Sequence, residues 1–267
     1  MARITKKDIY KQYGIDFDGN GHIYHNKYGW ISCLLVDGNE KIGKGVYHFS
    51  TLPTNQIFHV VINNVSYDIM GTCPCNCKGC YATKGNFQRF PEKVLPSLAI
   101  RTLLIREDLD FVKRAIIAQI KADKISFVRI HASGDFDSLA YVETWQEIIK
   151  ACADCVSWTY TKYNDAENAF DIFDNANIVK SKIPHYGFNF GHCDYILALY
   201  EHLKNIGESV YICRCGIDPQ QHCNTCKGRS KHKYVLFLEH STEYKADKDP
   251  LYDTLKAVIE SQDFSEI

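Results

Sequence analysis

The 267-residue chain lacks the features of a membrane-bound, secreted or polyanion-binding protein. It has no apolar run near the roughly 20 residues that span a bilayer, and residues 1–8 contain no apolar signal core. The net charge is −1, so nucleic-acid binding would require a local basic patch. The one candidate, residues 227–233, has no aromatic residues among its charges and is better explained as a solvated loop. We therefore expect a cytoplasmic protein with no membrane partner, and the net charge does not indicate a nucleic-acid partner.

Cysteine, in contrast, is abundant, with 12 residues of which eight form two tight groups, at 73–80 and 213–226. In a reducing compartment this clustering favours metal ligation over a framework of disulfides. Cys73, Cys77 and Cys80 have the spacing Cys-x3-Cys-x2-Cys, and three thiolates on one loop can hold a [4Fe-4S] cluster whose fourth iron has no protein ligand. Such an open iron can bind a small molecule.

Two alternatives stay open for this first group. Cys75 is either a spare thiol or a fourth ligand that closes the cluster. Structural zinc is the competing metal because sites of four cysteines are common, although their ligands usually come in pairs from two separated turns.

The second group consists of two short pairs, Cys213 with Cys215 and Cys223 with Cys226. The pairs can converge on one tetrahedral zinc ion or on a second iron–sulfur cluster, and the spacing does not choose between them. A site of either kind would fix the loop between the last two expected strands.

The order of apolar patterns predicts an α/β protein. Residues 1–64 are rich in Gly, Asn and Tyr without a helical period, which favours an irregular, partly β layer. Strands then alternate with helices over residues 65–240, which favours a partial (open) β/α barrel of about six parallel strands with the cysteine-rich loop 213–226 near its end. Residues 241–267 complete the chain as a tail or helix.

The expected elements can be placed along the sequence. The predicted strands cover 65–70, 125–130, 156–161, part of 179–190, 209–212 and 234–238. The predicted helices cover most of 91–122, the segment after Asp137 or Ser138, a segment from about 165 that carries Phe170 and Ile172, and one from about 194 that Gly207 ends.

Polar residues follow the first two expected strands. The cysteine loop follows the first strand, and Ser133, Gly134 and Asp135 follow the second. Ligands bind at the carboxyl ends of parallel strands, so we expect the open iron and the Asp135 carboxylate to face one cavity. Asn189 is a candidate for holding a ribose or a substrate group there, with a turn as the equal alternative.

Other cysteines and histidines are interpreted as structural. Cys152 and Cys155 have the spacing of a redox motif, but they lie at the end of a helix, where the dipole raises the pKa of a thiol, and we expect them to pack in the core. His131 and His240 lie near strand ends, where a lone histidine is more often a hydrogen-bonded structural residue than a ligand.

The cysteine motif carries a resemblance. The spacing of Cys73, Cys77 and Cys80 resembles that of the radical S-adenosylmethionine superfamily, and Gly134-Asp135 is similar to its Gly-Gly-Glu segment. Four segments more closely resemble the phage-associated gene product eighty-eight family. These are Gly-Lys-Gly-Val at 43–46, Thr-Cys-Pro at 72–74 with Cys-Tyr-Ala at 80–82, residues 129–136, and the last cysteines before Phe-Leu-Glu-His at 237–240.

This resemblance implies S-adenosylmethionine at the open iron, reduction by an electron donor, and radical chemistry on an unknown substrate, in the host cytoplasm if a phage encodes the chain. It implies that Asp135 accepts a hydrogen bond from the methionine amino group, with Ser133 and Gly134 beside it, and that Tyr81 forms a wall of the cofactor site. The chain departs from the superfamily at Gly79, where an aromatic residue is usual, in the shorter acid, and in having no visible adenine-bordering glycine motif.

A non-catalytic protein is the alternative. Both cysteine groups would then hold structural zinc or iron–sulfur clusters, and the surface would recognise a partner or a nucleic acid. The two hypotheses differ in whether one iron is open to a ligand. The sequence does not identify the residues that contact a substrate.

Overall fold

The computed structural model describes residues 3–38, 43–75, 80, 82, 90–166, 168–183, 187–214, 217, 234–238 and 245–262. The helices are α1 (Lys6–Gln12), α3 (Pro91–Glu107), α4 (Leu109–Asp123), α5 (Leu139–Ala151), α6 (Cys193–Asn205) and α8 (Tyr252–Glu260). The longer strands are β1 (His22–His25), β2 (Gly29–Ser32), β5 (Ile57–Ile62), β6 (Val65–Met70), β7 (Phe127–Ile130), β8 (Val156–Thr161), β9 (Ala176–Lys180) and β14 (Tyr234–Leu238). The shorter strands are β3 (Val36–Asp37), β4 (Tyr47–Phe49), β10 (Lys182–Ile183), β11 (Gly187–Phe188), β12 (Phe190–Gly191) and β13 (Val210–Ile212).

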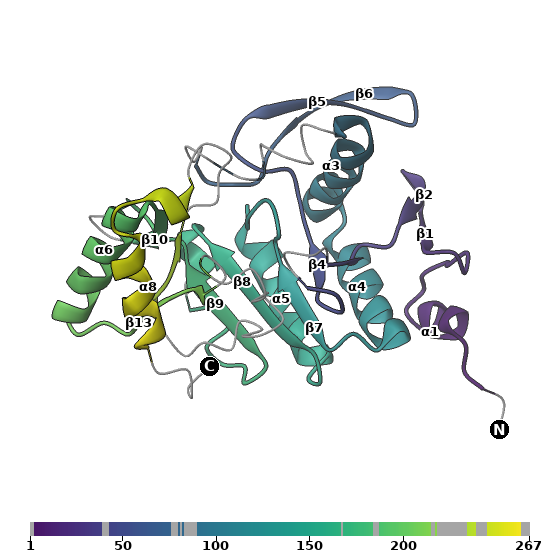
Figure 1. The fold of residues 1–267 in the computed structure, drawn as a ribbon. Helices are drawn as coiled ribbons and strands as arrows, with labels where there is room; N and C mark the ends of the chain where they lie inside the picture. Colours follow the sequence, from purple (N-terminus) through teal and green to yellow (C-terminus); the bar gives the residue numbers. More distant parts are fainter. Residues whose placement is uncertain are drawn as a thin grey trace.

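The main sheet has five strands in the order β3-β4-β7-β8-β9. Strands β4, β7, β8 and β9 run parallel to one another, while β3 pairs antiparallel with β4. A second, three-stranded parallel sheet has the order β12-β14-β13. The protein is therefore a mixed α/β protein with several sheets (Figure 1), and the strands that the structure describes form neither a closed barrel nor one run of six parallel strands.

The predicted place of strand 65–70 as the first strand of the barrel is wrong. The segment does form a strand, β6, but it pairs antiparallel with β5 in a separate two-stranded hairpin. The place beside β7 is taken by β4, which has three residues. So short a strand carries too little alternation of apolar and polar residues to be recognised in a sequence.

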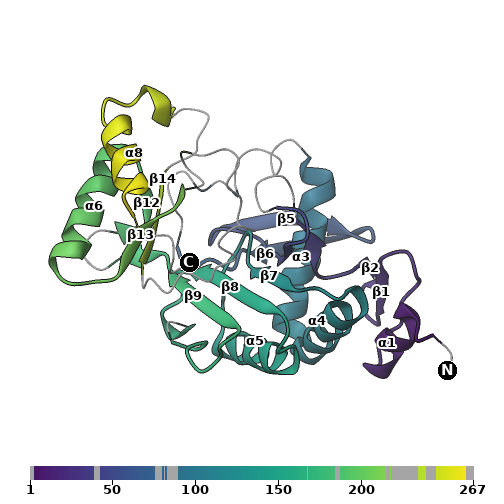
Figure 2. The same cartoon turned by 60° about the horizontal axis from the view of Figure 1, so that its bottom comes forward.

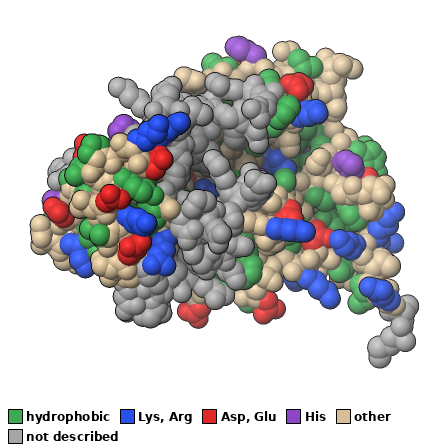
Figure 3. Space-filling view, viewed as in Figure 1, with side chains coloured by type: hydrophobic (Ala, Val, Ile, Leu, Met, Phe, Trp, Pro, Cys, Tyr) green, Lys and Arg blue, Asp and Glu red, His purple; other side chains and the backbone are tan. Residues whose placement is uncertain are grey.

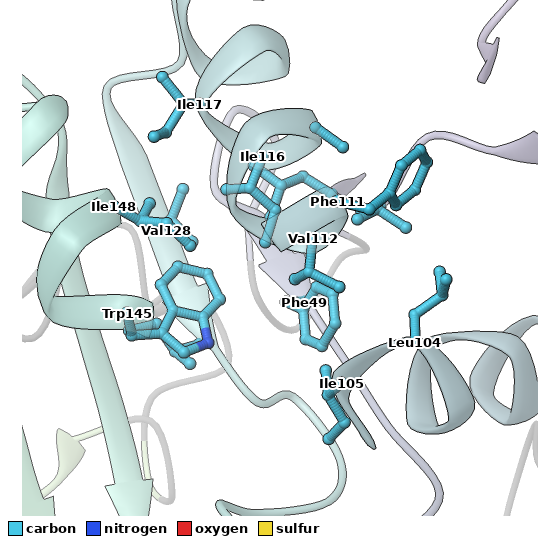
Figure 4. Packing of buried hydrophobic residues seen from close by; sticks show 14 of the residues in the cluster. Phe49, Leu104, Ile105, Phe111, Val112, Ile116, Ile117, Val128, Trp145 and Ile148 are labelled. Carbon is cyan, nitrogen blue, oxygen red and sulfur yellow. The ribbon is translucent and has the colours of Figure 1, made fainter. Parts of the chain in front are cut away.

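The main core lies between the five-stranded sheet and its helices. In two views, α4 and α5 cover one face of this sheet (Figures 1 and 2). Phe49 of β4, Val112 of α4 and Trp145 of α5 meet in this layer, where each is at most 1% exposed (Figure 4). Burying one such side chain contributes about 1.5 to 3 kcal/mol, so this layer holds the sheet edge that carries the site in place.

A second core joins the carboxyl-terminal elements. Helices α6 and α8 pack against β13 and β14 through Leu199, Ile212, Leu236, Leu255 and Ile259. These helices lie at the opposite end of the molecule from α1 (Figure 2). In the described part of the chain no helix is long and apolar enough to cross a membrane.

Several helix predictions can be checked individually. Helix α5 begins after Ser138, whose hydroxyl caps it by accepting from Tyr141 N, and α6 ends before Gly207 with φ +78°. The expected helix from about residue 165 is wrong: the chain forms a single 3-10 turn, Asn164–Ala166, and Ile172 is 78% exposed. The sequence analysis also missed α1, because seven residues give too short a periodic pattern.

Candidate functional site

The loop after β7 brings Gly134 against two threonines. His131 (φ +61°) and Gly134 (φ +80°) both adopt the left-handed conformation, and they bend the chain back under residues 51–54 and 71–73. A Cβ atom at Gly134 would lie 1.9 Å from Thr51 Oγ1 and 2.7 Å from Thr72 Oγ1. Only glycine fits both the backbone angle and the space.

Hydrogen bonds join this loop to the segment that leads into the first cysteine group. Thr51 N donates to Ser133 O (3.0 Å), and Ser133 Oγ donates to Thr51 O (2.8 Å). Thr72 Oγ1 accepts from Asp135 N (2.9 Å) and lies 2.9 Å from Thr51 Oγ1. The cysteine loop and the Asp135 loop are therefore fixed relative to each other at their first residues.

Asp135 is a buried carboxylate held by three donors. It is 3% exposed, and its Oδ1 accepts from Thr161 Oγ1 (2.5 Å) and from Phe136 N (2.8 Å). Its Oδ2 accepts from Lys162 N (2.8 Å). Burial raises the pKa of Asp135 to about 6, and the three hydrogen bonds counteract this effect only in part. The group is thus oriented and mainly ionised at neutral pH.

The first cysteine group starts beside this carboxylate. Thr72 N donates to Leu52 O (3.0 Å), and the next residue, Cys73, donates its N–H to Thr54 O (3.0 Å). Burial raises the pKa of the Cys73 thiol to about 12, and the charges of Asp135 and Cys80 act in the same direction. Asp135 and Cys80 are therefore each near enough to the Cys73 thiol for their charges to act on it.

Several predicted ligands cannot be placed. Cys77 and Tyr81 of the first group lie outside the described residues, and so do the basic stretch 227–233 and His240. Among the residues that are described, no three His, Cys, Asp or Glu side chains form a group that could hold a metal ion. Three thiols of the first group are described, Cys73, Cys75 and Cys80, and thiolates suit a soft metal such as zinc or iron in a sulfide cluster.

The second cysteine group is described only at Cys213. This residue follows β13, is 8% exposed and packs with Val179, Tyr211 and Val235. Its N–H donates to Leu236 O (2.8 Å), which continues the pairing with β14. The other three cysteines of the group, Cys215, Cys223 and Cys226, fall outside the described residues.

Asn189 links two strands. It is 3% exposed. Its side-chain Nδ2 donates to Val235 O (2.8 Å), and its backbone carbonyl oxygen accepts from Phe237 N (2.7 Å). These contacts connect the chain before β12 to β14, and they use one of the two N–H groups of the side-chain amide.

The residues interpreted as structural have the expected surroundings. Cys152 and Cys155 are buried in the main core. His131 is 3% exposed, with Nε2 3.0 Å from Tyr141 Oη and Nδ1 3.4 Å from Thr159 Oγ1. Burial and the charge of Arg129 lower the pKa of His131 to about 3, so it is a neutral, hydrogen-bonded residue.

The sequence analysis missed Arg106, which connects the two loops from outside. Its Nε donates to Asp137 Oδ2 (2.8 Å), while Nη1 donates to Met70 O (2.7 Å) and Nη2 to Gly71 O (3.3 Å). The guanidinium therefore joins the chain before Cys73 to the chain after Asp135. No local sequence signal marks such a residue, because its partners are 31 to 36 positions away.

The hydroxyl partners of Asp135 were also missed. Thr161 is the last residue of β8, so its position at the carboxyl end of a parallel strand was the signal that could have identified it. Thr51 carries no comparable signal, because it follows β4, which is too short to be recognised in the sequence. Thr72 follows the expected strand 65–70, but only the cysteines after it were selected.

Comparison with known proteins gives one match. A family model described as gene product 88 matches residues 33–190, which include Cys73, Cys80 and Asp135 and more than half of the chain. The chain matches no curated protein and no solved structure. These results confirm the gene product 88 part of the resemblance and give no support to the part that concerns the radical S-adenosylmethionine superfamily.

Proposed function

The chain belongs to the gene product 88 family, and we propose that it is an iron–sulfur protein that binds S-adenosylmethionine for radical chemistry on an unknown substrate. The observation that carries the proposal is the buried carboxylate of Asp135, whose loop is hydrogen-bonded through Thr72 to the segment that leads into Cys73. A [4Fe-4S] cluster on Cys73, Cys77 and Cys80 would supply one electron to the sulfonium of S-adenosylmethionine, with an electron-donor protein as its source.

Asp135 provides the recognition of an ammonium group. Thr161 Oγ1, Phe136 N and Lys162 N fix the plane of the carboxylate, so the remaining acceptor site on Oδ2 points in a set direction. A hydrogen bond from the methionine ammonium to this anion is worth on the order of 1.5 to 3 kcal/mol. It would also stabilise the ionised form that burial disfavours.

The neighbouring residues keep the acid and the thiols at a fixed separation. Gly134 lets the Asp135 loop approach Thr51 and Thr72 closely, and Thr72 Oγ1 accepts directly from Asp135 N. Arg106 joins the same two loops a second time, through its hydrogen bonds to Met70 O and Asp137 Oδ2. A ligand that contacts both the thiol loop and the carboxylate therefore meets a pre-organised site, which reduces the entropy lost on binding.

Spectroscopy of the anaerobic protein tests this proposal. After reconstitution with iron and sulfide, we expect a brown protein whose reduced paramagnetic resonance spectrum changes when S-adenosylmethionine is added. Cys73→Ala and Cys80→Ala should lose iron, whereas Cys33→Ala, a half-buried cysteine elsewhere, is the matched control and should retain it. Asp135→Asn should keep the iron but weaken the spectral change.

The role of Cys75 follows from the same experiment. If it is a spare thiol, Cys75→Ala leaves the response to S-adenosylmethionine intact, and if it closes the cluster, the variant enhances the response. The proposal would be wrong if the reconstituted protein held stoichiometric zinc and no iron. It would also be wrong if wild type and Cys75→Ala both ignored S-adenosylmethionine and formed no 5′-deoxyadenosine.

A non-catalytic protein with structural metal sites is the second candidate, and the position of Cys213 favours it. Cys213 is buried where β13 ends beside β14, so zinc or a cluster bound there would stabilise the carboxyl-terminal sheet. Lys and Arg are interspersed with Asp and Glu on the described surface in view (Figure 3), which gives no support to a nucleic-acid partner. Loss of metal and of thermal stability in Cys213→Ala, together with a first site that ignores S-adenosylmethionine, would establish this candidate.

A further inference from the structure

The five-stranded sheet has a second face, on the side away from α4 and α5 (Figures 1 and 2). Side chains alternate between the two faces along each strand. Ile130 of β7 belongs to the main core on the helix side, so Arg129 beside it points to the second face. Thr159 of β8 lies 3.4 Å from His131 on the helix side, so Trp158 points to the second face as well.

Four neighbouring strands each place one side chain with a hydrogen-bonding group in a single row on this face. The polar row consists of His48 of β4, Arg129 of β7, Trp158 of β8 and Asn177 of β9, and each residue is the registered partner of the next. Neighbouring strands lie about 4.8 Å apart, so these side chains are adjacent. Parallel strands are usually apolar on both faces, and a departure from that rule indicates a functional site.

Arg129 gives the polar row its charge. Its guanidinium carbon lies 5.1 Å from the centre of the Tyr160 ring, which in turn meets the ring of Phe237 from β14 at 5.1 Å and nearly at a right angle. The cation–π contact restricts the orientation of the guanidinium. A planar fork of N–H donors matches the oxygens of a carboxylate or a phosphate.

The two neighbours of Arg129 in the row are neutral donors. His48 Nδ1 lies 3.0 Å from Ser50 Oγ, and burial with the charges of Arg101 and Arg129 lowers the pKa of His48 to about 4. The imidazole is thus neutral at pH 7 and has one N–H to donate. Trp158 is 0% exposed, and its indole N–H has no acceptor among the described residues. Because a buried donor without an acceptor destabilises a fold, an acceptor brought by a ligand would be favourable.

The charges around the polar row favour an anion. The row itself contains arginine and no aspartate or glutamate. The charge of Asp37 acts on His48 in the opposite direction to that of Arg129, but Asp37 Oδ1 already accepts from Gly38 N and Gly45 N (2.9 Å each). One cation flanked by neutral donors is the arrangement that selects an oxyanion.

We propose that His48, Arg129 and Trp158 bind an oxyanion, the carboxylate or phosphate group of a small organic molecule. The use of that molecule as the substrate rests on the proposed function, whereas the binding itself needs no iron. A chain that fails to form the cluster would still bind the anion, so the two proposals can fail separately.

NMR of the full-length chain before reconstitution with iron tests the proposal with two probes. Line broadening in phosphorus spectra reports bound inorganic phosphate, and saturation transfer reports bound acetate. We expect saturable binding that chloride at equal ionic strength does not reproduce, and the tighter probe identifies the group. Arg129→Gln should weaken binding by about tenfold or more. The matched control is Arg114→Gln, which removes the same charge from an ion pair with Asp110 on α4 and should bind as the wild type does.

Three further variants test the neighbours and guard against misfolding. His48→Ala and Trp158→Phe each remove one neutral donor and should weaken binding by about threefold to tenfold. Arg129→Lys keeps the charge without the fork and should bind with intermediate affinity, and circular dichroism checks that each variant is folded. A wild type that binds neither probe would overturn the proposal. Equal weakening by Arg114→Gln and Arg129→Gln would overturn it too, because binding would then follow net charge alone.

Discussion

Replacing Gly134 with alanine tests how tightly the two loops of the site are packed. Two costs add at this position. The residue has φ +80°, and a non-glycine residue in the left-handed region costs about 1 to 2 kcal/mol. The new Cβ would also overlap Thr51 Oγ1 at 1.9 Å, and overpacking of this kind costs typically 1 to 3 kcal/mol. We expect Gly134→Ala to lower the free energy of unfolding by about 2 to 5 kcal/mol.

Gly207 provides a control that separates the two costs. It has nearly the same angle, φ +78°, but a Cβ there would meet no atom within 4 Å. Gly207→Ala should therefore cost only the roughly 1 to 2 kcal/mol of the backbone angle. Adding Thr51→Ala to Gly134→Ala removes the overlapping hydroxyl, so the double variant should lose less than the sum of the single changes.

Urea unfolding followed by circular dichroism measures these differences. The slope with denaturant should stay constant across the variants, so that a shift of the midpoint reports a change of stability. If Gly134→Ala were no more destabilising than Gly207→Ala, the close approach of the Asp135 loop to Thr51 would be refuted. Asp135 would then not be held at a fixed place relative to Cys73 by this contact.

Two further predictions concern His131 and Arg106. The pKa of His131 is about 3 in the folded protein and about 6.5 when unfolded, so the unfolded state binds more protons between these values and stability is lost as the pH falls. Between pH 7.5 and 5.0 this lowers the free energy of unfolding by about 2 kcal/mol. In denaturant titrations at the two pH values, His131→Gln should therefore lose less stability than the wild type. An equal loss in the two proteins would contradict the buried, neutral state of His131. Arg106→Lys should lower the free energy of unfolding by about 1 to 2 kcal/mol and reduce iron uptake, because an ammonium cannot make the guanidinium's hydrogen bonds to Met70 O, Gly71 O and Asp137 together. An iron content equal to that of the wild type would show that Arg106 does not position the thiol loop.

Helices and strands that bury one face along their whole length could be predicted from the sequence. The stripe of α5 and its cap at Ser138 are as expected, as is β8 over 156–161. These elements bury one face over many residues, so their apolar spacing is strongly constrained. The three residues of β4 carry no such pattern. Without β4, the strand predicted at 65–70 was assigned the place beside β7 in the sheet.

In the candidate site, too, some residues could be predicted from the sequence and others could not. Cys73, Cys80 and Asp135 could be selected because cysteine spacing and an acid after a strand are local signals. Their supports could not, because Thr51, Thr72 and Arg106 reach this place through contacts between segments far apart in the chain. A single sequence contains no information on such pairings beyond residue type.

The electrostatics of Asp135 and His131 show why one of these buried groups points to function. His131 is buried in its neutral form at neutral pH, and its partners are neutral hydroxyls, so the fold loses little by holding it. Asp135 has its pKa raised to about 6, so its folded-state advantage is present below the unfolded pKa and is lost as the pH rises through 6. At pH 7 the charged group costs about 3 kcal/mol relative to its unfolded pKa of about 3.9. A cation bound at the oriented Asp135 carboxylate would offset this cost, and this is the physical reason for the proposal that Asp135 receives the ammonium of S-adenosylmethionine.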